Sequence, residues 1–459
     1  MSGRPEPFSD ALLASYRIRS VFKRYKFHIL FAVAIAVLLS VAALVVFKQM
    51  GGTPSDPTFP RGMTYSEYQS HIVSYASIPA YNKTATPKVA FSVLGCKALM
   101  LKRYPYFTKP WATSSPGPVY MNTDLDTPEL RTLVERDGLG IVTMSGEPSP
   151  HRRFYFMTLD LYEREPDADW YVMVDDDCVL FIDNLMNLLS DLDPHQPMYI
   201  GGASENTIAV GRHGWMAFGG GGAVLSKAAM QRLSQLGPMD CMLDHLDVFG
   251  GDEKLSMCVF DARVPFTPVA GFHQMDIKGD ASGFIEGVVS QSIPISMHHF
   301  GALDQMYPHM SNSEAAVVLE TSSMGSNLFR RAVGHLPLLI NGSEVNVTIS
   351  VVNGFRVKLW PQFDYLSKFA RVEHTWSSWY RASVGSGAME SMSLRPTEPR
   401  GSYQSYTWTK EGVYEADGDL FGITGVSVRE GQCGGWSVCD GVVTGSVLSI
   451  MVDWDSVTV

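Results

Sequence analysis

The sequence predicts an α/β domain that is followed by a mainly β region and preceded by one membrane-spanning helix. Between residues 87 and 335, short apolar runs alternate with amphipathic segments, which is typical of a mostly parallel, Rossmann-like sheet covered by helices. Residues 336–459 instead contain runs in which polar and apolar residues alternate with period two. An uninterrupted apolar run fills residues 27–47, the length of a transmembrane helix.

The composition excludes several classes of protein. A chain of 459 residues is too long for one ordinary domain, and 45% hydrophobic with 18% charged residues excludes a largely disordered protein. The formal net charge of −11 argues against a nucleic-acid partner, because phosphate contacts need a basic surface. Six cysteines are too few for a disulfide-built scaffold but leave room for one or two disulfides.

The apolar run at 27–47 is predicted to cross a membrane once as a signal anchor. Its alternative, a buried core helix, is rarely apolar on every face. Five Arg and Lys residues lie between residues 17 and 26, whereas only Lys48 separates the run from Arg61. The positive-inside rule therefore predicts a cytosolic tail at 1–26 and places the rest of the chain across the membrane.

The segment after the anchor is predicted to be a stem. Residues 48–86 are rich in Gly, Pro, Ser and Thr, the composition of a linker. Three Asn-x-Ser/Thr sequons, at Asn82, Asn341 and Asn346, all lie beyond the apolar run and agree with a lumenal location.

The α/β region, predicted at 87–335, is built from alternating strands and helices. Five-residue apolar runs such as 170–174 are typical of strands buried on both faces. The predicted elements are, in order, a strand at 88–94, a helix within 148–165, a strand at 170–174, a helix at 183–192 capped by Asp183, a strand at 198–200 and a helix at 227–236 capped by Ser226.

The last region, 336–459, is predicted to be a mainly β accessory unit. Two alternating runs flank Asn353-Gly354, a pairing that indicates a β-hairpin, and residues 446–453 predict a further strand. Cys433 and Cys439 could form a disulfide in an oxidising lumen. A metal pair is less favoured, because no second cysteine pair lies nearby.

Three consecutive carboxylates, Asp175, Asp176 and Asp177, follow the predicted strand at 170–174. Ligands of open α/β sheets bind beyond the carboxyl ends of strands, and adjacent carboxylates repel one another unless a cation is present. Oxygen ligands suit Mg²⁺ or Mn²⁺. In an extended chain Asp175 and Asp177 face the same way and could approach a metal together. The alternative is a solvated acidic turn.

Two glycine-containing motifs follow the triplet. The glycines at 219–222 allow close approach of the backbone to a ligand, although no Lys-Ser/Thr follows them as in a nucleotide P-loop. Asp252 and Glu253 follow two further glycines, and a carboxylate there could act as a general base. Alternatively, Asp252 could cap a helix over 253–260.

Two neighbouring histidines, His298 and His299, close the set of motifs. Neutral imidazole is a ligand for Mn²⁺ or Zn²⁺, although a lone histidine is more often structural. If the chain is extended, the two rings face opposite sides, so we expect only one of them to bind a metal.

In order and spacing, these motifs resemble the Fringe-like branch of glycosyltransferase family 31, the inverting β1,3-glycosyltransferases, and look closest to its plant- and fungal-type members. The resemblance runs from Trp170 to Pro308 and extends weakly upstream. The matching stretches are WYVMVDDDCVLFIDNL, MYIGGASE, AFGGGGAVLS, FGGDEKLSMC, GFHQMDIKG and ISMHHF, with NGFRVKLWP and HTWSSWYR as weaker matches further on.

The resemblance implies a GT-A fold, a UDP-sugar donor and a divalent cation, usually Mn²⁺. Asp175 and Asp177 match the family's Asp-x-Asp motif, and Asp177 is the expected direct metal ligand. His298 falls at the position of a histidine ligand, with His299 as the fallback and His273 as a third candidate.

The resemblance also implies the remaining site residues. Asp252-Glu253 matches the acidic motif that supplies the base; we favour Asp252, which directly follows the glycines, and keep Glu253 as the alternative. The residues implied in donor binding are Asp175, Asp176, Lys97, Arg103, Gly220 and Gly221.

The implied protein is a type II Golgi, or endoplasmic reticulum, membrane enzyme. It would transfer a sugar from a UDP-sugar to a glycan or glycoprotein acceptor with inversion. Two other functions compete with this one. A catalytically silent lumenal lectin or chaperone would not use the acidic motifs, and a metal-dependent phosphohydrolase would need more His and Asp clusters for two metals.

Overall fold

The computed structural model describes part of the chain, all of it within one compact unit, Phe59–Val459. The predicted tail and anchor, Asn82 and Asn341 lie outside the described residues. Within the described part, no helix is both long and apolar enough to cross a membrane. The described residues are 72–79, 86–144, 149–245, 248, 250–304, 306–322, 324–340, 342–362, 366, 369, 372–379, 404–417, 422–434 and 437–457.

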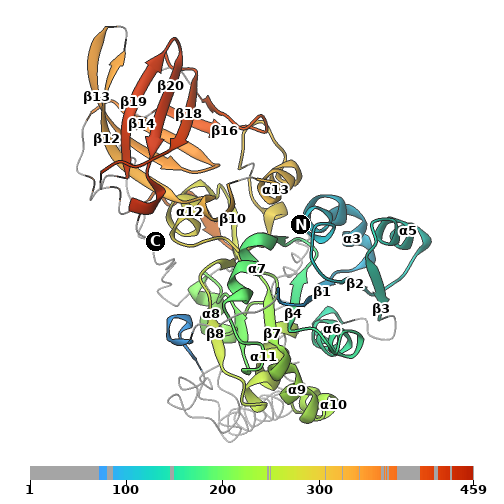
Figure 1. Ribbon diagram of the computed structural model, residues 1–459. Coiled ribbons are helices and arrows are strands. Elements are labelled where there is room, and N and C mark those ends of the chain that lie inside the picture. Colours follow the sequence, from blue (N-terminus) through green and yellow to red (C-terminus); the bar gives the residue numbers. More distant parts are fainter. Residues whose placement is uncertain are drawn as a thin grey trace, which may run out of the picture. The chain divides into compact units, whose positions relative to one another are not determined.

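A seven-stranded mixed sheet forms the centre of the α/β domain, in the order β3-β2-β1-β4-β7-β6-β8 (Figure 1). Among these strands, β7 runs antiparallel to β4 and β6, and the other pairs are parallel. The predicted α/β class with a mostly parallel sheet is therefore confirmed. The strands are β1 (Val89–Leu94), β2 (Val119–Thr123), β3 (Gly140–Thr143), β4 (Trp170–Asp175), β6 (Tyr199–Gly201), β7 (Ala223–Ser226) and β8 (Phe266–Pro268).

Helices cover both faces of this sheet, and β4 shows why its sequence is apolar throughout. Tyr171 and Met173 belong to one apolar cluster together with side chains of α6 and α11. Trp170, Val172 and Val174 belong to a second cluster with side chains of α5 and α7 on the other face. The main helices are α3 (Lys97–Arg103), α4 (Lys109–Ala112), α5 (Pro128–Arg136), α6 (Pro150–Arg164), α7 (Ile182–Ser190), α8 (Thr207–His213), α9 (Lys227–Gln235), α10 (Pro238–Asp244), α11 (Gly251–Asp261), α12 (Ser282–Gly287) and α13 (Asn312–Glu320).

The two predicted helix caps have different outcomes. Ser226 caps α9, because its hydroxyl oxygen accepts a hydrogen bond from the backbone N–H of Ala229. The prediction that Asp183 caps α7 is wrong. The helix begins at Ile182, so Phe181 occupies the cap position and Asp183 lies in the first turn.

A small three-stranded sheet brings distant segments together beside the end of β4. Its order is β5 (Val179–Leu180), β11 (Ser296–Met297) and β9 (Phe272–His273). Because β5 begins two residues after Asp177 and β11 directly precedes His298, their pairing places the triplet next to the histidines. A further strand, β10 (Ile277–Gly279), pairs with β15 (Trp376–Ser378) from the C-terminal part of the chain.

An eight-stranded sheet forms the C-terminal region, as the period-two pattern predicted. Its order is β12-β13-β14-β16-β17-β18-β20-β19. The predicted hairpin is confirmed: Val352 pairs with Arg356, and Gly354 takes the left-handed φ of 68° that the turn requires. The strands are β12 (Arg331–Ile340), β13 (Ser343–Val352), β14 (Arg356–Trp360), β16 (Gln404–Trp408), β17 (Tyr414–Ala416), β18 (Gly425–Glu430), β19 (Val438–Thr444) and β20 (Val447–Val452).

Two predicted boundaries differ from the structure. The division at residue 335 falls inside β12, which begins at Arg331 because its long pairing with β13 includes five residues before that division. Part of the predicted stem packs on the α/β domain, since Ile72 forms a β-bridge with Phe266.

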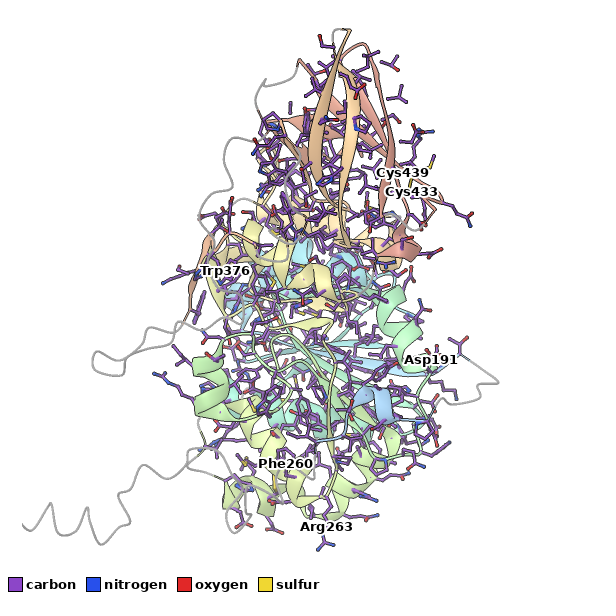
Figure 2. All side chains as sticks on the ribbon, turned by 90° about the vertical axis from the view of Figure 1, so that its left-hand side faces the viewer. Asp191, Phe260, Arg263, Trp376, Cys433 and Cys439 are labelled. Atoms are coloured by element: carbon purple, nitrogen blue, oxygen red, sulfur yellow. A yellow bond between two sulfur atoms is a disulfide. The ribbon has the colours of Figure 1, made fainter. Side chains whose placement is uncertain are left out.

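Two disulfides stabilise the described part of the chain. The predicted bridge between Cys433 and Cys439 is present beside β19 (Figure 2). A second one, between Cys241 and Cys258, was not predicted and joins α10 to α11. His245 lies close to those two sulfurs, but disulfide sulfurs are not available as thiolate ligands, so this group is not a metal centre.

Candidate active site

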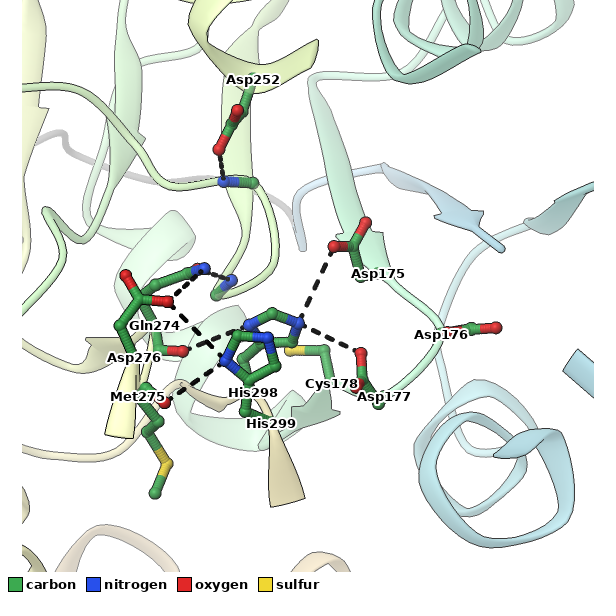
Figure 3. Close-up of polar contacts among 12 residues, drawn as sticks. Asp175, Asp176, Asp177, Cys178, Asp252, Gln274, Met275, Asp276, His298 and His299 are labelled. Atoms are coloured by element: carbon green, nitrogen blue, oxygen red, sulfur yellow. Dashed lines mark hydrogen bonds and ion pairs between the residues drawn. The ribbon is translucent and has the colours of Figure 1, made fainter. Parts of the chain in front are cut away.

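The carboxylates of the acidic triplet point in alternate directions (Figure 3). His298 Nε2 lies 3.1 Å from Asp177 Oδ1 and 3.8 Å from Asp175 Oδ2. Asp176 points away from the histidine and forms an ion pair with Arg103 at 2.7 Å. A second guanidinium nitrogen of Arg103 lies 3.2 Å from Asp177. The predicted shared direction of Asp175 and Asp177 is therefore confirmed.

The triplet holds more negative charge than its neighbours neutralise. Burial raises the pKa of Asp175 to about 7; His298 opposes this rise, and the neighbouring carboxylates add to it. Burial likewise raises the pKa of Asp176 to about 6 despite the Arg103 contact. For Asp177, burial is outweighed by His298 and Arg103, which hold its pKa well below the usual value. Added positive charge would stabilise this cluster.

His298 is oriented with one ring nitrogen toward the triplet. The side chain is buried, and its Nδ1 lies 3.2 Å from the carbonyl oxygen of Gln274, so Nδ1–H can donate there and leave Nε2 facing the carboxylates. Burial would lower the pKa of His298, but Asp177 and Asp175 raise it to about 9. The structure thus places an imidazolium, or a metal ligand, against two carboxylates.

The prediction that His298 and His299 face opposite sides is wrong. His299 adopts a left-handed φ of 59°, so the chain is not extended there, and the two rings stack with centroids 3.7 Å apart (Figure 3). His299 Nδ1 lies 3.3 Å from the Met275 carbonyl and 3.7 Å from Asp276. Burial and the neighbouring His298 lower the pKa of His299 to about 3, which keeps its ring neutral.

The third histidine candidate, His273, contacts other partners. Its Nδ1 lies 2.9 Å from Glu205, and its Nε2 lies 3.2 Å from the hydroxyl of Ser292. These contacts occupy both ring nitrogens. His298 is therefore the histidine that directly contacts the acidic triplet.

The glycine run brings backbone against the site side chains. Gly220 packs on His298 so closely that an added Cβ would lie 2.1 Å from the ring. The N–H of Gly221 donates to Gln274 at 2.7 Å, and that of Gly219 donates to Asp252 at 2.9 Å. Because a side chain at Gly220 has no space, the run is needed for this close approach.

Asp252 and Glu253 lie at the start of α11 but have different surroundings. Asp252 accepts hydrogen bonds from the N–H groups of Gly219 and Glu253, each at 2.9 Å. Burial raises the pKa of Asp252, while these two donors oppose that rise. Glu253 instead contacts His213 at 3.0 Å and accepts from the N–H of Gly250 at 3.4 Å.

The alternative prediction, that Asp252 caps this helix, is wrong. Gly250 occupies the cap position, and Glu253 supplies the side-chain contact to its backbone N–H. Asp252 is consequently left facing a cavity.

This cavity has a volume of about 640 Å³ and is lined both by residues around the acidic triplet and by Asp252. Asp175, His298 and His299 line one part of its wall, and Asp252 lines another. Glu253 is not among the lining residues. One carboxylate that could accept a proton therefore shares a cavity with the group that could hold a cation.

The predicted donor-binding residues are placed differently from one another. Arg103 reaches the triplet, and Gly220 lines the cavity. Lys97 begins α3, where its backbone N–H donates to Asp124 at 2.8 Å, and it does not line the cavity. Its contact with a diphosphate stays a prediction.

Sequence reasoning missed Gln274, Asp276 and Trp379, which also line the cavity. Asp276 follows His273 in the GFHQMD motif, so its proximity to that motif was a usable signal. Trp379 is far away in the sequence, and only the pairing of β15 with β10 brings it to the cavity.

Comparison with known proteins shows what this arrangement resembles. A family model described as Fringe-like matches residues 84–302, which include the triplet, the glycine run, Asp252 and both stacked histidines. Residues 84–302 are therefore similar to the Fringe-like family. A second family model, described as a protein of unknown function, DUF604, matches residues 212–400 and so includes Trp379 beyond the Fringe-like domain.

Individual relatives share part of the chain. A human β-1,3-glucosyltransferase is 25% identical over 268 residues, covering 57% of this chain and 50% of the relative. A mouse β-1,3-glucosyltransferase is 25% identical over 229 residues, covering 49% of this chain and 43% of the relative. The chain thus spans half or less of the length of these curated relatives.

Two solved glycosyltransferase structures have low overall similarity to this chain. A mannosyltransferase from Pyrobaculum calidifontis, in complex with GDP-Man and Mn²⁺, has a TM-score of 0.31 and 14% identity, covering 43% of this chain and 58% of the other. The glycosyltransferase GlyE of Streptococcus pneumoniae TIGR4 has a TM-score of 0.28 and 16% identity, covering 41% of this chain and 46% of the other.

Proposed function

We propose that the Fringe-like domain is a metal-dependent, inverting glycosyltransferase of the GT-A type. It takes a UDP-sugar as donor and forms a β1,3 linkage to a glycan or glycoprotein acceptor. One observation carries the proposal: the cavity is lined by Asp175 and His298 at one part of its wall and by Asp252 at another. These groups match the two requirements of a single displacement, a base for the acceptor and a cation site for the leaving diphosphate.

The residues present fit a divalent cation such as Mn²⁺. Two neighbouring ligands of an octahedral ion lie roughly 3 Å apart, and His298 Nε2 lies 3.1 Å from Asp177 Oδ1. Asp175, Asp177 and His298 would hold the ion, with His299 as the fallback. When bound, the ion supplies positive charge that offsets the charge on the departing UDP.

Asp252 is the proposed base. Each of its oxygens accepts one backbone hydrogen bond, which fixes the carboxylate and leaves further lone pairs for the acceptor. Asp252 takes the proton of the acceptor hydroxyl while that oxygen forms a bond to the anomeric carbon. The bond from this carbon to UDP breaks, UDP leaves with the electron pair, and the configuration inverts.

The neighbouring residues position these groups. Glu253 remains bound to His213 and the start of α11, and so holds the turn that presents Asp252. Arg103 neutralises part of the triplet from the side that faces away from His298. Because both curated relatives are named β-1,3-glucosyltransferases, UDP-glucose is the first donor to test.

The decisive experiment measures UDP release from a panel of UDP-sugars, with Mn²⁺ and with a chelator. We expect Mn²⁺-dependent release that an acceptor accelerates and that Asp252→Asn abolishes, with Asp160→Asn on the surface of α6 as the matched control. Phosphate release from phosphate esters in place of UDP release from UDP-sugars would instead identify a phosphohydrolase, and no turnover of any donor would favour a silent binding protein.

We also propose that the protein is a single-pass type II membrane protein of the Golgi or the endoplasmic reticulum. The apolar run at 27–47 and its basic flank support this topology. Disulfides form in oxidising compartments, and the structure contains two. Asn346 is exposed on β13, where a glycan would have space.

Glycosylation tests this topology. Enzymatic deglycosylation should shift the mobility of the full chain, and Asn346→Gln should remove part of that shift if the site is used. Protease added to sealed vesicles should remove only the N-terminal tail. Digestion of the C-terminal region in sealed vesicles would reverse the proposed orientation.

A further inference from the structure

Three aromatic rings form a continuous stack that runs from the acidic triplet to the cavity wall. His298 stacks on His299, and His299 stacks on Trp379 with centroids 4.6 Å apart and planes only 5° from parallel. Trp379 lines the same cavity as Asp252 and remains 44% exposed. One face of the indole is therefore covered by His299, and exposed indole surface remains beside the cavity.

The backbone position of Trp379 is set by strand pairing and not by contacts of its ring. The backbone N–H of Trp379 donates to the carbonyl oxygen of Asp276 at 2.8 Å, which continues the pairing of β15 with β10. Trp376, in the same strand, is buried and packs edge-on against Phe284, with ring centroids 5.7 Å apart. Trp376 thus anchors the segment in the core, while Trp379 presents an apolar surface to the cavity.

We propose that Trp379 is the platform on which the acceptor sugar stacks. This inference rests on the proposed glycosyltransferase function and names the class of acceptor: a hexopyranose or deoxyhexopyranose with several C–H bonds on one face. Such a face carries partial positive charge, which complements the negative face of the indole. A ring with only two rotatable side-chain bonds also loses little entropy when it binds.

The location favours the acceptor over the donor. The diphosphate of the donor is expected next to Asp175, Asp177 and His298, at the inner end of the stack. The acceptor hydroxyl must reach Asp252, which lines the cavity together with Trp379. The platform lies outside the Fringe-like match and inside the second family match, so the segment after the Fringe-like domain contributes to acceptor choice.

The test measures glycoside binding, which does not need turnover. Full-length protein with Mn²⁺ and UDP is titrated with methyl β-D-glucoside, methyl β-D-galactoside and methyl α-L-fucoside by ligand-observed NMR. We expect at least one of them to bind, and Trp379→Leu, which keeps apolar bulk but loses the ring, to weaken that binding about tenfold or more. Trp379→Phe should stay within about threefold of the wild type, because it keeps a ring face.

Controls separate this inference from misfolding and from the proposed function. Trp215→Leu removes another exposed tryptophan, one that does not line the cavity, and should leave glycoside binding unchanged. UDP affinity should stay the same in both Trp379 variants, which also reports folding of the site. A wild type that binds glycosides through Trp379 but releases no UDP would contradict the proposed function while supporting the platform.

Three results would overturn the platform. The first is unchanged glycoside binding by Trp379→Leu. The second is an equal loss of UDP affinity, which would assign the ring to the donor base. The third is a wild type that binds none of the three glycosides.

Discussion

The two large sheets of the molecule differ in how far their buried charges are neutralised by ion pairs. At the carboxyl end of β4, Arg103 and His298 are the ion-pair partners of the three carboxylates among the described residues, and negative charge remains in excess. In the eight-stranded sheet the interior cluster is apolar, and buried Lys358 forms an ion pair with Glu286 of α12 at 2.7 Å. The neutral Lys358–Glu286 pair connects the eight-stranded sheet to α12. The uncompensated charge of the triplet instead indicates that a cationic ligand binds there.

The largest expected effect concerns Asp252, the cavity-facing carboxylate. Asp252→Asn should lower transfer by about 10²–10⁴-fold, the usual contribution of a general base. UDP affinity should change only a few fold, because the donor is held at the other end of the cavity. Glu253→Gln, the matched neighbour, should be milder, since Glu253 faces His213. Steady-state kinetics and UDP titration measure both.

The reverse outcome would reassign the base. If Glu253→Gln is inactive while Asp252→Asn remains active, Glu253, which lies outside the cavity lining, is the base.

The next effect concerns the excess charge of the triplet itself. Asp177→Ala should lower turnover by about a hundredfold or more, as the loss of one electrostatic stabiliser does. A chelator should abolish activity, and Mn²⁺ should restore it. Full activity in chelator would show that the excess charge does not serve a cation.

The balanced pair in the other region should behave as a structural contact. Lys358→Met leaves Glu286 buried without its partner and should destabilise the fold by about 3–5 kcal/mol. The double variant Lys358→Met/Glu286→Leu should recover most of that loss, because no charge stays buried. Denaturation midpoints measure stability, and transfer by the double variant should remain close to that of the wild type.

If Lys358→Met and the double variant are equally unstable, apolar side chains cannot replace the ion pair, and its contribution is not limited to neutralising Glu286. A loss of transfer in a stable double variant would show that the interface, and not only the cavity, affects the reaction.

The smallest expected effect tests whether excess charge always indicates a function. Glu320 of α13 has one buried oxygen without a hydrogen-bond partner among the described residues. Burial and the nearby Asp183 raise its pKa to about 8, from an ordinary value of 4.5. Since the folded-state pKa is the raised one, its carboxyl group favours folding at low pH and destabilises the folded protein increasingly as pH rises from about 4.5 to 8.

Glu320→Gln should therefore raise the melting temperature at pH 8, by the equivalent of about 1 kcal/mol, and not at pH 4.5. Glu163→Gln, on the surface of α6, is the control. Transfer should be unaffected. A loss of transfer in Glu320→Gln would mean that this second unbalanced carboxylate also belongs to a functional site.

Local patterns predicted most of the elements around the site. The apolar run at 170–174 predicted β4, and the spacing of Asp175 and Asp177 predicted their common direction, because both depend on neighbouring residues alone. The Asp183 cap failed for the opposite reason. Ile182 packs in an apolar cluster and is the first residue of α7, so Asp183, a favourable capping residue, lies in the first turn instead.

The contacts that complete the site depend on long-range pairing. Nothing in the sequence around His299 indicates its left-handed φ, which arises where the chain leaves β11. The disulfide between Cys241 and Cys258 follows from the packing of α10 against α11. No periodic pattern in the sequence around Trp379 predicts that this residue lines the cavity.

The sequence by itself determined the kinds of groups in the site: three carboxylates after a buried strand, a glycine run, an acidic pair and two histidines. Side-chain chemistry and local spacing are properties of short segments, so the sequence carries them directly. Only the tertiary structure decided that Asp252 and not Glu253 lines the cavity, that both histidines stack on one side, and that Trp379 joins them. Those choices depend on the packing of α11, β11 and β15, whose neighbours come from segments distant in the chain.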